Sequence, residues 1–175
     1  MIVEFGHLAL ILAFCASIFL IVVPTIGLRY RWINFTNLAS PLTIFQFFFT
    51  LISFLILMSA FIRSDFSVKL VAKNSHTLKP LIYKISGTWG NHEGSMLLWV
   101  LILTFFGFLV ACFGQSLRHD FKVKVLIIQS AIAAFFYAFI LFTSNPFERY
   151  SIPPFNGLGQ PLVKLVNVVP PSSDR

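Results

Sequence analysis

Residues 95–114 read SMLLWVLILTFFGFLVACFG, an apolar stretch without Asp, Glu, Lys or Arg. A helix that rises ~1.5 Å per residue needs ~20 such residues to cross the ~30 Å hydrocarbon layer of a bilayer. Three further uncharged stretches lie near 5–27, 42–62 and 125–144. The sequence therefore predicts an all-α, polytopic integral membrane protein with about four transmembrane helices.

The composition supports lipid as the solvent of this chain. It has 175 residues, of which 57% are hydrophobic and 11% are charged, and it contains 22 phenylalanines. A single water-excluded core could not hide so many apolar side chains. Strands of a membrane barrel would alternate apolar and polar residues, whereas residues 101–106, LILTFF, are apolar on all sides. We therefore expect helices in contact with a lipid bilayer.

Basic residues flank the predicted spans. The formal net charge is +7, but the Lys and Arg residues are spread over several loops, which argues against nucleic acid as a partner. Two short loops carry positive charge and are predicted to be cytoplasmic, which places both termini on the outer, periplasmic face. These loops contain Arg29 and Arg31, and Arg118, Lys122 and Lys124.

The expected organisation has two parts. Residues 1–144 form the four-helix transmembrane region, and 145–175 form an extended, polar C-terminal tail rich in Pro and Gly. An outer-face loop over 63–94 is longer than the usual ~4 to 6 residues, and such length often indicates a functional surface. Because only Glu4 precedes the first span, without a basic leader, we expect that span to stay attached rather than act as a signal peptide.

The cysteines and isolated histidines indicate no metal site. Cys15 and Cys112 each fall inside a predicted span, where a buried apolar cysteine is the favoured interpretation. Neither belongs to a CxxC motif. His7, His76 and His119 lie near span ends or in loops and are interpreted as solvated side chains.

The most informative motif, WGNHEGS, immediately precedes the apolar stretch 95–114. Asn91 or Ser95 can cap the start of that helix, and the two glycines of the motif permit close backbone approach or positive φ. The positive end of the helix dipole favours Glu93. These structural roles explain the motif without any ligand.

His92 also fits a functional role. A neutral imidazole at a membrane surface could ligate haem iron or relay a proton, and the neighbouring Glu93 could tune its pKa. Capping or loop packing nevertheless ranks ahead, because a lone histidine without a second ligand is weak support for a metal site. Trp89 suits the aromatic belt at the membrane interface.

Within the spans, Gln46, Gln129 and Tyr137 are predicted to hydrogen bond between helices, since polar groups in hydrocarbon seek partners. Pro24 is predicted to kink or to end the first helix. No span carries Lys, Arg, Asp or Glu at its centre. Because transport sites usually place such groups inside spans, a transporter component is the less favoured hypothesis.

Several segments together resemble the CcmF family of cytochrome c-type haem lyase subunits, and they follow the family's order. They are GHLALILA at 6–13, SDFSV at 64–68 with Val71, Ala72, Asn74 and Ser75, WGNHEGSMLLW at 89–99, and NPF at 145–147. The block at 89–99 is the most specific of them.

This resemblance implies a role in system I cytochrome c maturation, in the bacterial or mitochondrial inner membrane. Members of the family receive haem from the chaperone CcmE and are thought to attach its vinyl groups to the two thiols of a CxxCH apocytochrome c. CcmH-type and CcmI-type proteins assist them. The matched motif residues are Trp89, Gly90, His92, Glu93, Gly94 and Trp99, of which His92 is the candidate haem contact; no catalytic residue is assigned.

One departure from the family pattern limits this expectation. The family's tryptophan-rich haem-binding segment and its haem-ligating histidines have no match in the 175 residues. We therefore expect the iron ligands in a remaining CcmF portion outside this chain, and no lyase activity from the chain alone. A non-catalytic membrane scaffold subunit or a truncated product is the alternative, ahead of a transporter component.

Overall fold

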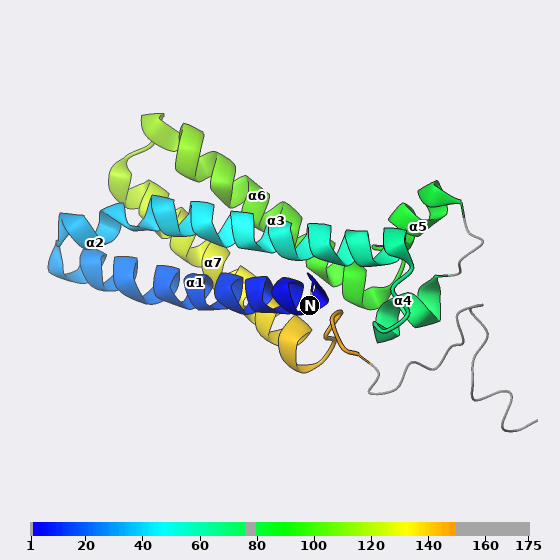
Figure 1. The fold of residues 1–175 in the computed structure, drawn as a ribbon. Coiled ribbons are helices and arrows are strands. Elements are labelled where there is room, and N and C mark those ends of the chain that lie inside the picture. Colours follow the sequence, from blue (N-terminus) through cyan, green and yellow to red (C-terminus); the bar gives the residue numbers. More distant parts are fainter. Residues whose placement is uncertain (1, 76–79, 150–175) are drawn as a thin grey trace, which may run out of the picture.

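Four long antiparallel helices form the protein, as seen in a computed structural model that describes residues 2–75 and 80–149 (Figure 1). Each is long and apolar enough to cross a membrane. The prediction of an all-α polytopic membrane protein with four such helices is confirmed. The helices are α1 (Ile2–Tyr30), α3 (Ala39–Arg63), α6 (His92–Phe113) and α7 (His119–Phe142).

Shorter elements connect the long helices. The helix α2 (Ile33–Asn37) and the 3-10 helix η1 (Gly114–Ser116) lie at one end of the bundle. At the other end, α4 (Lys69–Asn74) and α5 (Leu81–Gly87) occupy part of the stretch 63–94 that was expected to be a loop. A helix as short as α4 depends on tertiary burial of its apolar side chains, which local sequence does not reveal.

The four long helices form a closed arrangement. Helix α1 packs against α3 and α7, and α6 packs against the same two helices, so α1 and α6 occupy opposite corners. The buried face of α1 carries Ala9, Ala13 and Ala16 at helical spacing. Small side chains let helix backbones approach closely in a membrane, where van der Waals packing replaces the hydrophobic effect as the cause of association.

Buried polar residues join the helices within the bundle. Ser130 Oγ of α7 donates to the Ser17 carbonyl of α1 at 3.1 Å and lies 3.5 Å from Gln46 Oε1 of α3. The hydroxyls of Tyr137 and Thr50 hydrogen bond with each other between α7 and α3. Partners of this kind satisfy polar groups that hydrocarbon would leave unpaired, and the predicted role of Gln46 and Tyr137 is confirmed.

Gln129 makes the third predicted interhelical contact. Its Nε2 donates to the Leu103 carbonyl of α6. Gly107 of α6 makes room for this side chain, since a Cβ there would lie 2.8 Å from Gln129 Nε2. The polar side chain thus enters α6 where glycine leaves space.

The structure limits one sequence interpretation and corrects another. Pro24 does not end the first helix, because α1 continues to Tyr30. Transmembrane helices tolerate proline where neighbouring helices, side chains or local adjustments satisfy the freed backbone carbonyl. Cys15 is exposed on the bundle surface rather than buried. An apolar thiol can face lipid as readily as a core, so burial does not follow from its polarity.

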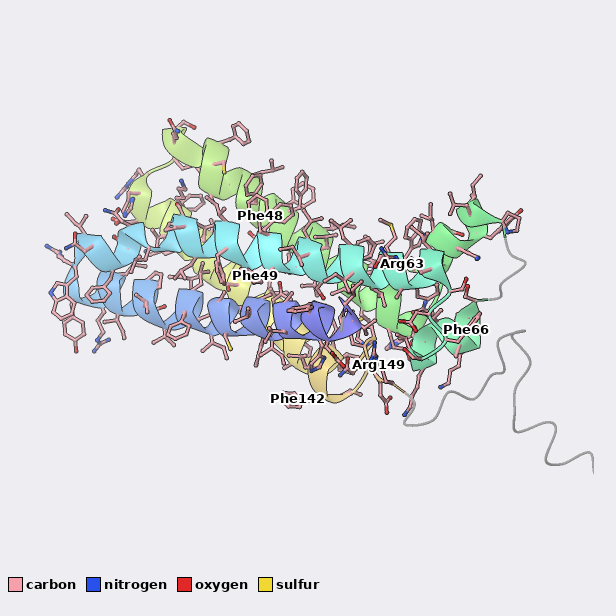
Figure 2. All side chains as sticks on the ribbon, viewed as in Figure 1. Phe48, Phe49, Arg63, Phe66, Phe142 and Arg149 are labelled. Atoms are coloured by element: carbon pink, nitrogen blue, oxygen red, sulfur yellow. The ribbon has the colours of Figure 1, made fainter. Side chains whose placement is uncertain are left out.

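The outward surface of the bundle is apolar. Phe48 of α3 is 47% exposed, Phe135 of α7 is 71% exposed, and many other large hydrophobic side chains point away from the helix contacts (Figure 2). In water such a surface would associate, whereas in a bilayer it meets hydrocarbon of matching polarity. The aromatic excess of the sequence therefore lies largely on the surface.

The bundle has two ends of different character. The start of α1, the end of α3, α4, α5, the start of α6 and the end of α7 form one end, here called the motif end (Figure 1). The opposite end, here called the basic end, comprises α2, η1 and the helix ends beside them. It carries Arg29, Arg31, Arg118, Lys122 and Lys124.

Candidate functional site

The motif end brings together segments that are far apart in the sequence. Residues 6–7, 64–75, 89–95 and 145–149 all lie there (Figure 1). Figure 2 shows Arg63, Phe66 and Arg149 at this end, whereas Phe48 and Phe49 lie along the middle of α3. The segments that carry the family resemblance therefore converge, apart from the parts of 6–13 and 89–99 that continue into the helices.

Asn91 links α5 to α6. Its Oδ1 accepts a hydrogen bond from the Gly94 backbone N–H at 2.7 Å, which caps the start of α6. Its Nδ2 donates to the Gly87 carbonyl at 2.8 Å, at the end of α5. The predicted capping role of Asn91 is confirmed, and the same side chain also fixes the angle of the turn between the two helices.

Gly94 occupies a site without room for a side chain. A Cβ at this position would lie 1.6 Å from the Thr88 carbonyl oxygen. At Gly90 the nearest atom to such a Cβ, the Ser86 carbonyl oxygen, would be 3.3 Å away. Of the two roles expected for these glycines, close backbone approach therefore applies at Gly94, and neither glycine has positive φ.

Ser95 is the other residue that was considered as a cap. Its Oγ donates to the Trp89 carbonyl at 2.5 Å, so it joins α6 to the preceding turn without capping the helix. Trp89 itself is 40% exposed. Three backbone-directed contacts, from Asn91, Gly94 and Ser95, thus hold the turn 88–91 in one position on α6.

His92 and Glu93 are the first two residues of α6. His92 is exposed, and its ring lies 6.1 Å from the ring of Phe139, edge to face. Within residues 2–75 and 80–149, no hydrogen bond of the His92 ring is found. Glu93 is half-buried, and Trp99, two turns further along α6, is 69% exposed.

A second set of contacts ties the start of α1 to the segment after α7. Asn145 Nδ2 donates to His7 Nδ1 at 3.3 Å, and Asn145 Oδ1 accepts from the Phe147 backbone N–H at 3.0 Å. The Phe147 ring packs edge to face on His7, with centroids 6.3 Å apart. Gly6 makes this possible, because a Cβ there would lie 2.6 Å from the Phe147 ring.

His7 therefore corrects an interpretation from the sequence. The sequence predicts a solvated histidine, but His7 is half-buried beneath Phe147 and hydrogen bonded to Asn145. His119 at the basic end is exposed, and its Nε2 also has a partner, Thr36 Oγ1 at 3.0 Å. His76 lies outside the described residues. No sequence spacing connects positions 7 and 145, so only the folded bundle could identify the pair.

The segment after α7 also contacts α4. The Lys69 N–H donates to the Glu148 carbonyl at 2.9 Å, and the two side chains form an ion pair. Val68 pairs with Arg149 in an isolated antiparallel bridge, and Val68 and Phe147 are buried. Residues 145–149 therefore form part of the motif end, while the rest of the expected tail, 150–175, lies outside the described residues.

The turn after α3 is shaped by two residues of the motif SDFSV. Ser64 adopts the left-handed conformation with φ of 53°, which ends α3. Asp65 Oδ1 then accepts from both the backbone N–H and the hydroxyl of Ser67, at 3.1 and 2.7 Å. This is an Asx turn, and it directs the chain from α3 into α4.

The described side chains do not by themselves make a haem site. Within residues 2–75 and 80–149, no three His, Cys, Asp or Glu side chains gather in a way that could hold a metal ion. His92 is one exposed imidazole, whereas His7 is engaged with Asn145. Among the described residues, the motif end thus presents one exposed imidazole, that of His92.

Comparisons with known proteins agree with the motifs at this end. Residues 89–173 match the family model described as "Cytochrome C assembly protein". The chain is 51% identical over 157 residues to the cytochrome c-type biogenesis protein ccl1 of Rhodobacter capsulatus, which covers 90% of this chain and 24% of that protein. It is 37% identical to the cytochrome c-type biogenesis protein CcmF of Escherichia coli, across 93% of this chain and 25% of CcmF.

A solved structure has the same arrangement of helices. "Cytochrome c Heme Lyase CcmF" superposes with a TM-score of 0.79 at 28% sequence identity, over 85% of this chain and 25% of that one. The chain thus spans about a quarter of the length of the relatives it matches.

Proposed function

Because the chain belongs to the CcmF, Ccl1 and CycK family of cytochrome c-type biogenesis proteins, we propose that it forms one part of a haem lyase component. In this role it takes part in haem transfer from the chaperone CcmE to apocytochrome c. The observation that carries the proposal is the convergence of the family-like segments at the motif end. There the turn 88–91 is held by Asn91 and Gly94, and residues 145–147 are held by His7.

The proposal places the chain in a bacterial or mitochondrial inner membrane with the motif end on the outer face. Four crossings put the start of α1 and the end of α7 on that same side. The basic end then faces the cytoplasm or matrix, in keeping with the excess of Lys and Arg in its short loops. Contacts with CcmE, CcmH-type and CcmI-type proteins and apocytochrome c belong, on this proposal, to the motif end.

Haem enters this proposal as a group held largely by the rest of the protein. Because the family's haem-ligating histidines have no match in the 175 residues, we assign the iron ligands to the remaining CcmF portion. The role of this chain is to present the surface of Trp89, His92 and Glu93 beside that portion. His92 is the candidate haem contact in this surface, because its imidazole is exposed.

Complementation tests the proposal directly. The chain should be expressed together with the remaining portion of a CcmF relative in cells that lack their own CcmF, and holocytochrome c should be measured by in-gel haem staining. Restoration that requires both pieces supports the proposal. If both pieces are inserted and stable but no holocytochrome c forms, the proposed function is wrong.

A scaffold without direct participation is the second candidate, and the tight backbone packing at Gly94 favours it. His92→Ala and Glu93→Ala separate the two. If either substitution abolishes holocytochrome c while the protein level is unchanged, the surface participates in transfer. If both leave maturation unaffected and only Gly94→Leu blocks assembly, the motif is structural.

A further inference from the structure

The basic end contains a hollow that the proposed function does not use. It opens between the end of α1, α2 and the start of α7. Arg31, Thr36, His119, Asp120 and Lys124 line it together with the apolar side chains of Leu28 and Ile33. A second hollow, lined by Arg118 and Phe121, adjoins the first and shares two of its residues, Asp120 and Lys124.

The walls of this hollow are held in place. Arg31 lies in the left-handed region with φ of 56°, in a turn closed by the Trp32 N–H on the Gly27 carbonyl at 2.9 Å. A Cβ at Gly27 would lie 2.9 Å from Phe35 Cβ, so α2 rests directly on α1. The hydrogen bond between His119 and Thr36 then joins α7 to α2. These contacts hold the backbone from which the basic side chains extend.

The positive charge of the hollow is only partly balanced by the described residues. Arg31, Arg118 and Lys124 face a single carboxylate, Asp120, and among the described residues none of the three takes part in an ion pair. Lys122, by contrast, donates to the Ala111 carbonyl at 2.8 Å and is thus engaged at the end of α6. An anionic group in the hollow would meet a net positive surface.

An apolar stripe runs from the hollow along α7. Phe121, Ile128 and Ile132 are 57%, 62% and 46% exposed, and their spacing puts them on the same helix face as Lys124. One ligand class combines a phosphate with long apolar chains and is present wherever a helix bundle spans a bilayer, namely a phospholipid. Basic pockets at helix ends bind the headgroups of anionic lipids.

We propose that this hollow binds the phosphate of an anionic phospholipid whose acyl chains lie along Phe121, Ile128 and Ile132. Arg31 and Lys124 contact the phosphate from two sides, and Asp120 limits the affinity because its carboxylate repels the same group. The site is separate from the motif end, so its failure would leave the proposed function untouched.

Native mass spectrometry of the purified chain, titrated with phosphatidylglycerol in detergent, tests this site. Arg31→Gln and Lys124→Gln should each weaken binding about five-fold, the equivalent of the ~1 kcal/mol that one basic residue contributes near an anionic lipid. Arg29→Gln is the matched control, because it removes one charge at the same end without lining the hollow. It should change affinity less than about two-fold. Asp120→Asn should strengthen binding.

The competing outcomes are distinct. Equal losses for Arg29→Gln and Lys124→Gln would show diffuse attraction to a basic surface and overturn the site. Displacement of the lipid by an equal concentration of inorganic phosphate would mean that the hollow recognises free phosphate. Phosphatidylcholine, which has the same phosphate but no net charge, should bind more weakly than phosphatidylglycerol. Equal binding would show that the hollow does not select an anionic lipid, and the proposal would be wrong. Far-UV circular dichroism of each variant checks that helix content is retained.

Discussion

The two ends of the bundle differ in how closely their segments pack and in how their polar side chains are engaged. At the motif end, backbones approach closely, and side-chain amides join segments as distant as residues 7 and 145. At the basic end, charged side chains surround an open hollow, and among the described residues none of Arg31, Arg118 and Lys124 takes part in an ion pair. The close packing of the motif end suits a surface that presents a fixed shape to other proteins. The open, charged hollow of the basic end suits a mobile ligand such as a lipid. The predictions below test this contrast, from the largest effect to the smallest.

The largest effect is expected when engineered cysteines are labelled from one side of the membrane, because each position should either react or not react. In a chain with Cys15 and Cys112 replaced by Ser, Lys73→Cys at the motif end should react with a membrane-impermeant maleimide in intact spheroplasts. Arg29→Cys at the basic end should react only after lysis, because the proposed orientation places it on the cytoplasmic side. The reverse pattern would place the motif end inside and contradict the proposed function.

Gly94→Ala should cause the largest loss of stability. The added Cβ would collide with the Thr88 carbonyl at 1.6 Å, so the turn and the start of α6 must move apart. We expect a loss of about 3 kcal/mol or more in the free energy of unfolding. An SDS titration in mixed micelles, followed by Trp fluorescence, measures it.

Gly90→Ala is the control for that substitution, because the nearest atom to its Cβ would be 3.3 Å away. Its effect should stay below about 1 kcal/mol, since a neighbour has to shift by only a few tenths of an ångström. Similar losses at both glycines would mean that the close approach at Gly94 is not what holds the turn.

Asn145→Ala should have an intermediate effect. It removes the hydrogen bonds to His7 and to the Phe147 backbone, and we expect a loss of about 1 to 2 kcal/mol. Amide hydrogen exchange should also rise in residues 145–149 and at the start of α1, more than at the basic end. Unchanged exchange in both segments would show that these contacts do not couple them.

The smallest effect is expected at the basic end. Lys124→Gln should change the free energy of unfolding by no more than about 0.5 kcal/mol, because this exposed side chain has no ion pair among the described residues. The same substitution should weaken phosphatidylglycerol binding as described above. A large loss of stability without loss of lipid binding would reverse the contrast between the two ends.

Much of the fold follows from hydropathy. Uncharged stretches of about 20 residues predicted the four long helices, because in a bilayer the length of an apolar run decides whether it can span. The helices begin and end differently from those stretches: α7 starts at His119 and α1 reaches Tyr30. Helical turns that carry charges can lie at the membrane interface, where water solvates their side chains. A search for uncharged stretches therefore misses these first and last turns.

The candidate site was only partly predictable. Asn91 could be recognised as a cap, because capping depends on positions a few residues apart in the chain. The partners of His7 could not be recognised, and neither could the exposed position of Cys15. Both depend on which helix faces which, and that is set by the packing of small residues across α1 and its neighbours.

The sequence alone thus determined the solvent, the number of crossings, the cap of α6 and the family resemblance, since each of these depends on local composition or motif order. Only the tertiary structure decided that residues 6–7, 64–75, 89–95 and 145–149 share one end. Only it revealed that a side chain at position 94 would collide with the Thr88 carbonyl and that the basic residues surround a hollow. The physical reason is that hydrocarbon fixes how many helices cross but not how they pair. Their pairing depends on close packing and on hydrogen bonds between residues far apart in the chain.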